Sequence, residues 1–528
     1  MDWTLPYPTQ RAPVLARNVV ATSQPLAAQA GMAMLQAGGN AIDAALATAI
    51  TLTVVEPIMN GIGGDLYALV WDGRQLHGLD ATGAAPLAWL PQRFAGRREM
   101  PRSGWDSVTV PGQVSGWKAL SDRFGALPFA RLFEPAIRYA DEGFPVSPVI
   151  ASAWPQLAAL VADQPGFAEA FLPAGRAPRA GECWRFADQA RTLAEIAETG
   201  GESFYRGALA RRIVDGARAQ GGALTEDDLA RQQAQWLSPL SQRYGDFHLH
   251  EIPPNGQGIA AQMALGMLRH FDLRASGLDS AATLHLQIEA MKLAFADLHA
   301  HVADPRSMRV SADELLHPDY LAERARGIDA RHASPARAGA PRQGGTVYLA
   351  AADAAGRMVS LIQSNYYAFG SGVVVPGTGI ALHNRGWNFS LEPGHPNEVG
   401  PGKKPLHTII PGFATDAAGA PHMAFGVMGG FMQAQGHVQM MCRLADFAQN
   451  PQAMIDAPRF MVSPLDGTVK LEAHMPGGVA EGLRARGHRV DVLATGHLDF
   501  GAAQIVACAG DHHVAASDGR RDGLALGC

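Results

Sequence analysis

The segment RQGGTVYLAAADAAGRMVSLIQSNYYAFG, residues 342–370, carries the clearest β pattern in the chain. Two runs rich in β-branched and aromatic residues flank a short polar turn. The pattern predicts a strand over 346–352, a turn over 353–356 and a second strand over 358–366. The first of these strands is expected to be buried.

The residues just before this hairpin, RHASPARAGAPRQGG (331–345), are rich in Ala, Pro, Gly and Arg. They include no large apolar side chain, so this segment cannot pack a core and is predicted to be an exposed loop. A loop that runs straight into a buried strand is an unusual junction. We expect a processing site there, between Gly345 and Thr346.

A threonine at the start of a chain can act as nucleophile and base at once. Its hydroxyl alone is a weak nucleophile, but its own α-amine, once freed, lies within reach of the proton. Before cleavage the hydroxyl of Thr346 can attack the carbonyl of Gly345, and the resulting ester then hydrolyses. Gly344 and Gly345 allow the strained backbone that this attack requires. By itself, a Thr that opens a strand after glycines is ordinary, so the interpretation depends on the rest of the chain.

Acyl transfer also requires hydrogen-bond donors for the oxyanion. The sequence FGVMGGFMQAQ (425–435) places Gly429 and Gly430 between an apolar strand and a helical pattern. Their backbone N–H groups can bind an oxyanion, although a plain strand-to-helix turn explains the same pattern. Ser364, on the second predicted strand, has the parity to face the same side as Thr346 in a simple hairpin register. A solvated or core serine is the alternative for Ser364.

The periodicity of apolar residues predicts the flanking helices and strands, and glycine and proline mark the turns between them. Helices are predicted over 25–37 and 41–55, separated by Gly38-Gly39-Asn40. The further expected elements are a glycine-rich turn over 57–65, strands over 66–71 and 76–79, a mainly helical region over 114–240, and a loop over 252–258 that opens a helix to about residue 269.

The composition is that of a folded protein of ordinary charge. The 528 residues are 47% hydrophobic and 17% charged, and the formal net charge is −6. Such a chain can bury a sizeable core, and its mildly acidic balance argues against nucleic acid as a partner. The four scattered cysteines form no CxxC pair and indicate neither a zinc site nor a disulfide framework. None of the 19 histidines falls in an HExxH arrangement, so no metal is expected.

The N-terminal residues MDWTLPYPTQRAPVLARN (1–18) lack the charged start and apolar run of a signal peptide. No uninterrupted apolar stretch of about 18 residues occurs, so we expect no membrane span. The longest mainly apolar segment, 41–57, contains Asp43 and Glu56 and is interpreted as a buried helix. A cytoplasmic location is therefore expected.

These features occur together in the order found in the γ-glutamyltransferase family of N-terminal nucleophile hydrolases, which the chain resembles from about residue 15 to 520. The segments that carry the resemblance are GMAMLQAGGNAIDAALATAITLTVVEPIMNGIGGD (31–65), VPGQVSGWKAL (110–120), EPAIRYADEGFPVS (134–147), PPNGQG (253–258), GGTVYLAAAD (344–353), FGSGVVVPGTGIALHNRGWNFS (369–390), KKPLHTIIP (403–411) and GVMGG (426–430). Their shared order, rather than any single motif, makes the resemblance specific.

The resemblance implies an α+β fold, a four-layer αββα sandwich. It implies self-cleavage into a large subunit, 1–345, and a small subunit, 346–528, which stay together as one fold. By this resemblance Thr346 is the nucleophile, Gly429 and Gly430 form the oxyanion hole, and Ser364 lies near the free amine. The partners are then a small-molecule amide and, within a heterodimer, the other half of the chain, with a dimer of these left open. No cofactor is expected.

The chain departs from the glutamyl transferases at the positions that hold the amino-acid part of their substrate. Thr82 stands where the family has an Arg for the α-carboxylate, and Tyr366 stands where it has an Asn. The remaining replacements are Arg385 and Asn388 for the Gln and Asp that grip the α-amine, and His407-Thr408 for a Ser-Ser pair. The catalytic set is kept while the amino-acid clamp is lost.

We therefore expect a substrate other than a γ-glutamyl compound. Arg385 would repel an ammonium group, whereas its guanidinium suits bidentate binding of a carboxylate. An ion pair with a nearby acid is the alternative role for Arg385. Tyr366 and Trp387 are bulky and reduce the pocket, so a small amide that bears a carboxylate fits it. The other expected substrate-binding residues are Tyr366, Asn388, His407 and Thr408.

Within the wider family this pattern resembles the oxamate amidohydrolases of purine breakdown, or the glutaryl-type (cephalosporin) acylases. The predicted reaction is attack of Thr346 Oγ1 on the amide, release of ammonia or an amine, and hydrolysis of the acyl-enzyme by water. One alternative is a γ-glutamyltransferase or glutathione hydrolase with an altered clamp, which needs an amine-binding acid that the sequence does not identify. The other is an uncleaved, non-enzymatic binding protein, against which the intact Gly345-Thr346 and Gly429-Gly430 pairs argue.

Overall fold

The structure is a computed structural model that describes residues 7, 11–334 and 345–528. Two seven-stranded antiparallel sheets form its centre, in the orders β21-β2-β10-β11-β3-β4-β7 and β1-β20-β19-β15-β14-β9-β8. The first sheet contains Leu524–Gly527 (β21), Val19–Thr22 (β2), Gly345–Ala352 (β10), Met358–Tyr366 (β11), Asp65–Trp71 (β3), Leu76–Ala81 (β4) and Gln235–Leu237 (β7). The second contains Val14–Ala16 (β1), His512–Ser517 (β20), Ala503–Ala509 (β19), Pro421–Val427 (β15), Gly412–Asp416 (β14), Phe247–Glu251 (β9) and Leu240–Tyr244 (β8).

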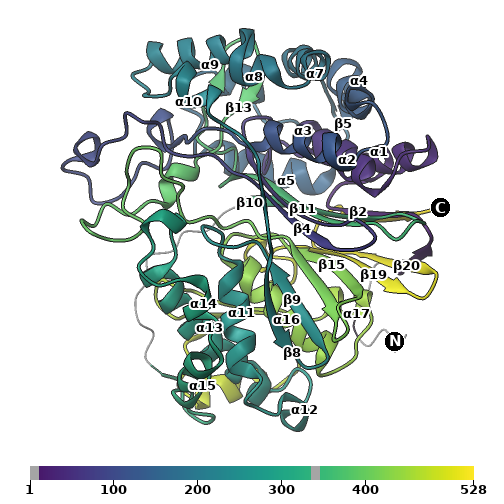
Figure 1. Ribbon diagram of the computed structural model, residues 1–528, viewed down its shortest axis with the longest axis vertical. Helices are drawn as coiled ribbons and strands as arrows, with labels where there is room; N and C mark the ends of the chain where they lie inside the picture. The colour runs from purple at the N-terminus through teal and green to yellow at the C-terminus, as the bar shows by residue number, and fades with distance from the viewer. Residues whose placement is uncertain (1–6, 8–10, 335–344) are drawn as a thin grey trace.

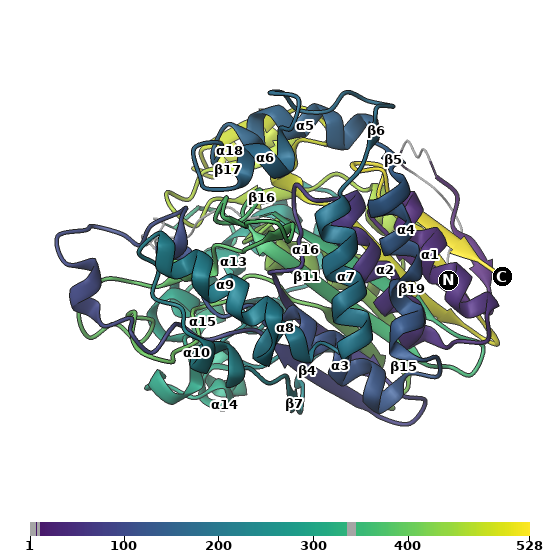
Figure 2. The same ribbon diagram turned by 90° about the horizontal axis from the view of Figure 1, so that it is seen from above.

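The two sheets share a core of apolar side chains, which includes Tyr67 and Tyr348 from the first sheet and Phe413 and Val506 from the second. Helices cover the outer face of each sheet, as Figure 1 shows above and below the strands. The helices on the first sheet include Pro25–Gln36 (α1), Ala41–Val55 (α2), Gln113–Phe124 (α3), Glu134–Glu142 (α4) and Ala187–Thr199 (α7), and those on the second include Gly258–Leu268 (α11), Ala281–His301 (α13) and Met432–Ala445 (α16). In Figure 2, α2, α4 and α7 lie side by side across the molecule.

Helix α2 shows how local sequence fixes these elements. The Asn40 side chain accepts hydrogen bonds from the backbone N–H groups of Ile42 and Asp43, and the Asp43 side chain reaches back to the N–H of Asn40. This capping box starts the helix, and Gly38, at a φ of 89°, ends the preceding one. Every residue of α2 is buried, because it packs on the sheet with one side and against other helices with the rest.

The predicted mixed α and β content is confirmed, and most element boundaries lie within a few residues of their predicted places. The predicted hairpin over 66–71 and 76–79 corresponds to β3 and β4, and the helix after the 252–258 loop is α11. The region over 114–240 is mainly helical, and the short strands it also contains are Phe144–Pro145 (β5), Cys183–Trp184 (β6) and β7. Most of the loop predicted over 331–345 falls in 335–344, outside the described residues. Within the described ranges, no helix combines the length and the apolar character that crossing a bilayer requires.

Strands β10 and β11 form the predicted hairpin, and they lie between β2 and β3 in the first sheet. The 346–528 part of the chain therefore contributes central strands to a sheet that the 1–345 part completes. The pairing is regular from Val347 opposite Gln363 to Ala352 opposite Met358, but it shifts between Gly345 and Val347. A β-bulge thus falls on Thr346, and bulges commonly re-aim a side chain beside a functional site.

Candidate functional site

Thr346 is 1% exposed and stands at the start of β10, joined to Gly345 by an ordinary peptide bond. The structure is therefore that of the uncleaved chain. The Thr346 hydroxyl donates to Oγ of Ser364 at 3.4 Å and accepts from Nε2 of Gln433 at 3.2 Å. The sequence-based expectation that Ser364 faces Thr346 agrees with this contact, even though the bulge breaks the simple register.

Gln433 is a contact of Thr346 that the sequence analysis missed. It is the second residue of α16, and its Oε1 accepts from the backbone N–H of Ile410 at 3.0 Å. That backbone donor fixes the orientation of the amide, because Oε1 must face the N–H and Nε2 must then face Thr346. Its place three residues after Gly430, on the first turn of a predicted helix, was the only signal available in the sequence.

Gly429 and Gly430 form the turn between β15 and α16, at φ values of 123° and 63° that side chains rarely adopt. Their carbonyls accept from the N–H groups of Met432 and Gln433 at the start of the helix. Within the described part of the chain, their own N–H groups make no hydrogen bond. Two free donors at a helix N-terminus form a region that attracts negative charge.

A cavity of about 140 Å³ reaches both Thr346 and Gly429. Its other lining residues are Met59, Leu157, Tyr367, Ala368, Met428, Met461, His497, Leu498, Asp499, Gly501 and Arg521. Its volume is well above the space that one bound water molecule needs on the same measure, about 10–15 Å³, so the cavity can admit a small substrate. Because it contains the predicted nucleophile and a predicted oxyanion donor, we take this cavity as the candidate active site.

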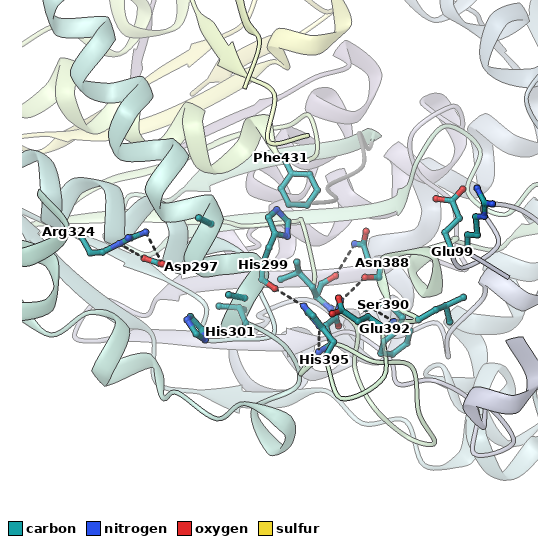
Figure 3. Close-up of a pocket in the computed structure, with 18 residues that line it drawn as sticks. Glu99, Asp297, His299, His301, Arg324, Asn388, Ser390, Glu392, His395 and Phe431 are labelled. Carbon is teal, nitrogen blue, oxygen red and sulfur yellow. Dashed lines mark hydrogen bonds and ion pairs between the residues drawn. The ribbon is translucent and has the colours of Figure 1, made fainter. Parts of the chain in front are cut away.

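A larger cavity, of about 760 Å³, lies elsewhere and does not include Thr346 among its lining residues. Figure 3 shows the Asp297–Arg324 ion pair on one side of this cavity and Asn388, Ser390 and His395 on another. Asn388, predicted to bind substrate, lies here, and its Nδ2 donates to the carbonyl of Leu406. The structure thus does not bring Asn388 to Thr346, because Asn388, the last residue of the short 3₁₀ turn Arg385–Asn388 (η5), is held by Leu406 beside a cavity that Thr346 does not line.

Arg385 is fully buried. Its Nη1 donates to Oγ1 of Thr408 at 2.8 Å, and its guanidinium carbon lies 4.3 Å from the ring centre of Tyr366. Its Nε and Nη2 have no hydrogen-bond partner among the described residues. Burial lowers the pKa of Arg385 to about 10, and Asp65 opposes this shift, so the group stays charged at neutral pH. A buried cation with two unused donors is expected to have an acceptor that the protein does not supply.

Asp65 is the acidic residue beside Arg385, and the sequence analysis did not single it out although it ends the quoted glycine-rich loop. Its Oδ1 accepts from the N–H groups of Gly83 and Gly112 at 3.2 and 3.1 Å, and His407 Nε2 lies 3.1 Å from its Oδ2. Burial, followed by the nearby Arg385, lowers the pKa of His407 to about 3. His407 is therefore neutral and donates to Asp65, which leaves this carboxylate engaged on both oxygens.

The backbone around Tyr366 is distorted. Its φ of 77° is rare for a residue with a side chain and costs on the order of 1–3 kcal/mol. The N–H of Tyr366 donates to Oγ of Ser364 at 2.7 Å, and the ring is buried against Trp387 and Arg385. Tyr366 thus connects the residues around Thr346 with those around Arg385.

The side chain of Thr82 is bound to Asp80 and is not available to a substrate. Its hydroxyl and its N–H both donate to Oδ1 of Asp80, and Oδ2 of Asp80 accepts from Lys404. A threonine at this position therefore completes a local network and offers no charge to a carboxylate. This contact is consistent with the loss of the arginine clamp expected from the sequence.

One group of side chains has the composition of a metal site: His285, Glu289 and His488. Nδ1 of His285 lies 2.8 Å from Nε2 of His488, and its Nε2 lies 2.7 Å from the carbonyl oxygen of Asp329. Nζ of Lys292 donates to Oε1 of Glu289 at 2.7 Å. The candidate ligand atoms are thus engaged with one another, and an ammonium group lies among them, which favours a structural network over a cation site.

Comparison with known proteins places this geometry in context. The family model described as gamma-glutamyltranspeptidase matches residues 27–528. The chain is 38% identical to the oxamate amidohydrolase proenzyme of Klebsiella pneumoniae, over 95% of this chain and 97% of that protein. It is 34% identical to the glutathione hydrolase-like YwrD proenzyme of Bacillus subtilis, over 97% and 98%. The crystal structure of cephalosporin acylase from Bacillus halodurans matches with a TM-score of 0.94 at 46% identity, over 99% of this chain and 98% of that one.

Proposed function

The chain belongs to the γ-glutamyltranspeptidase family, in which its relatives are hydrolases of the N-terminal nucleophile type, and we propose that it is a self-cleaving amidohydrolase with Thr346 as the nucleophile. The substrate we propose is a small amide that bears a carboxylate, as oxamate does. The observation that carries the proposal is the position of the Thr346 hydroxyl, held between Gln433 and Ser364 in a cavity that also contains Gly429.

Self-cleavage would begin with attack of Thr346 Oγ1 on the carbonyl carbon of Gly345. The peptide C–N bond breaks, the nitrogen of Thr346 takes up the proton, and an ester joins Gly345 to Oγ1. Water then hydrolyses the ester and leaves a free α-amine on Thr346. The β-bulge supports this step, because it places the scissile bond in a distorted part of the strand.

In the mature enzyme the α-amine of Thr346 would take the proton from Oγ1 as the hydroxyl attacks the substrate amide. The N–H groups of Gly429 and Gly430, together with the start of α16, would stabilise the negative charge on the carbonyl oxygen. The donor amide of Gln433 would favour the charge that develops on Oγ1. The C–N bond then breaks, ammonia or an amine leaves with the proton, and water releases the acid from the acyl-enzyme. None of these steps calls for a cofactor.

Arg385 is the residue we propose for the substrate carboxylate. Its two unused donors are the geometry that a bidentate carboxylate satisfies. Tyr366, Thr408 and His407 would shape this part of the pocket: Tyr366 stacks on the guanidinium, Thr408 orients it, and His407 keeps Asp65 engaged. Arg385 is fully buried and lines neither of the two cavities described above, so substrate access to it would require a rearrangement after cleavage.

The arrangement of helices, two sheets and helices supports the four-layer αββα sandwich of the N-terminal nucleophile hydrolases. We propose that cleavage divides it into 1–345 and 346–528, which remain one body because β10 and β11 pair with β2 and β3. The proenzyme relatives support this processing.

Action on γ-glutamyl compounds is the second candidate, and the similarity to the glutathione hydrolase-like protein favours it. It requires an acid free to bind the α-amine. Asp65 is the acid that raises the pKa of Arg385 most. Both of its carboxylate oxygens already accept hydrogen bonds, and Arg385 would repel an ammonium group bound there. The similarity to a cephalosporin acylase leaves a longer acyl chain as a further variant of the same chemistry.

A paired assay on purified, cleaved protein tests the proposal. One arm follows ammonia release from oxamate, and the other follows hydrolysis of a γ-glutamyl anilide. Activity on oxamate alone supports the small-amide function. Activity on the anilide alone contradicts it and means that residues other than Arg385 hold the amino acid.

A further inference from the structure

The cavity beside Thr346 contains a cationic side chain that the proposed mechanism does not use. Arg521 lines this cavity together with Thr346 and Gly429, and it is only 8% exposed. The C-terminal segment that carries Arg521 lies between β20 and β21, so it is anchored at one end to each of the two sheets. This placement fixes a guanidinium near the nucleophile.

Within the described part of the chain, Arg521 forms no ion pair within 4.0 Å, and its one side-chain hydrogen bond joins Nη1 to the carbonyl oxygen of Arg520 at 2.7 Å. Burial lowers its pKa, and Asp518, Glu56 and Asp522 oppose that shift from a greater distance. A buried guanidinium without a directly bound acid is costly unless an anion binds it. The lining of the cavity therefore provides a site for an anion.

Asp499, the acidic residue that lines the same cavity, does not form an ion pair with Arg521. Oδ2 of Asp499 accepts from Nζ of Lys470 at 2.6 Å, and the backbone N–H of Asp499 donates to Nδ1 of His497 at 3.3 Å. Its charge is thus already balanced by a lysine. The rest of the wall is largely apolar, with Met59, Leu157, Met428 and Met461. Such a lining suits a short aliphatic group that ends in a carboxylate.

Arg521 and Arg385 occupy different surroundings. The ring of Tyr366 lies over Arg385, whereas the next residue, Tyr367, lines the cavity with Arg521. Arg385 is absent from the described residues that line the cavity. If Arg385 holds the carboxylate of the acyl part, the cavity with Arg521 is left for the amine part.

We propose that Arg521 binds a carboxylate on the amine part of the substrate, so that the preferred substrate is an N-acylated amino acid. This inference rests on the proposed function. The bond that breaks is the amide C–N bond, the amine nitrogen takes the proton that left Oγ1, and the amino acid departs. Water supplies the oxygen that completes the acid. Glycine is the smallest amino acid that could occupy this cavity, so its N-acyl derivative is the substrate chosen for the test.

The test compares N-oxalylglycine with N-isobutyloxamate, an amide of matched size whose amine part has no charge. For cleaved wild-type protein we expect kcat/KM to be at least about 10-fold higher for N-oxalylglycine. The Arg521→Gln variant should bring this ratio close to one, chiefly through KM, and Arg521→Lys should keep part of it. Because the ratio is taken within each variant, partial loss of folded protein does not alter it. Arg218→Gln, at an exposed site, is the matched control and should keep the wild-type ratio.

A binding measurement separates this inference from the proposed function. The uncleaved Thr346→Ala chain should bind propionate in calorimetry, and adding Arg521→Gln should weaken that binding at least about 10-fold. If wild-type protein hydrolyses no amide but propionate binding still depends on Arg521, the proposed function fails and the anion site stands. A wild-type ratio near one, or a ratio or propionate affinity unchanged by Arg521→Gln, overturns the inference.

Discussion

The guanidinium of Arg385 stacks on the ring of Tyr366, 4.3 Å from its centre, with both side chains fully buried. The stack holds a cation that the surrounding residues do not fully satisfy. Since removing one partner of a buried charge pair costs about 2 kcal/mol or more, Arg385→Ala should raise KM for oxamate at least about 30-fold. Steady-state kinetics on the cleaved protein measures this effect. Arg218→Ala, at an exposed arginine, should leave KM as it is, and an unchanged KM in Arg385→Ala would remove its assigned role.

Gln433 should affect both the cleavage and the catalytic rate. In Gln433→Glu the side chain can still accept from Ile410, but it no longer donates to Oγ1 of Thr346. A hydrogen bond to a developing charge contributes about 1.5–3 kcal/mol, so we expect cleavage and kcat to slow by about 10- to 100-fold. Gel electrophoresis over time measures the rate of cleavage, and steady-state kinetics on the cleaved protein measures kcat. Gln156→Glu, on the surface, is the control, and equal rates in both variants would count against a role for Gln433.

Stability should depend on pH through Glu56, the buried residue that caps the C-terminus of α2. Burial raises the pKa of Glu56 to about 7, although a hydrogen bond from Ser23 opposes the shift. A raised folded-state pKa means that the folded chain binds more protons than the unfolded chain between about pH 4.5 and 7. The free energy of unfolding should therefore fall by about 3 kcal/mol as pH rises through this window, measured against Glu56→Gln. If urea unfolding gives the same change in the free energy of unfolding with pH for wild type and Glu56→Gln, Glu56 is not the cause of the pH dependence.

The base in the proposed mechanism is the α-amine of Thr346 and not a histidine. His383 and His407 both have pKa values near 3, chiefly because they are buried, so neither titrates between pH 5 and 9. The acidic limb of kcat/KM should then have a midpoint near the ordinary α-amine value of about 7.7–8.0. In His407→Gln this midpoint should stay in place, whatever happens to the rate. If the acidic limb of the kcat/KM profile is absent in His407→Gln, the base is His407 and not the α-amine.

The fold could be predicted well where local sequence decides structure. The break at Gly38-Gly39-Asn40 and the runs of β-branched and aromatic residues over 346–366 predicted α2 and the central hairpin, because backbone hydrogen bonding and burial both favour these elements. The bulge at Thr346 could not be predicted, since register near a strand end depends on the neighbouring strands. The order of strands in the two sheets also lies beyond local pattern.

The candidate site was predicted in part. Thr346, Ser364, Gly429, Tyr366, Arg385 and Thr408 are linked by the contacts described above, while Asn388 lies in another cavity. Gln433 and Asp65 were missed although both lie in quoted segments, and Arg521 was missed because its segment has no motif, since sequence alone does not show which side chains meet across the fold. Only tertiary packing brings such residues to Thr346 or Arg385. The orphaned donors of Arg385, likewise, become visible only once its neighbours are known.

The most direct test of the account is the intact mass of the purified protein, with N-terminal sequencing of its smaller fragment. We predict that the 55.8 kDa chain yields two fragments, that the smaller one begins at Thr346, and that Thr346→Ala stays a single, inactive chain. A wild-type protein that hydrolyses oxamate as one uncleaved chain, or that is cut at a different bond, would contradict Thr346 as the nucleophile.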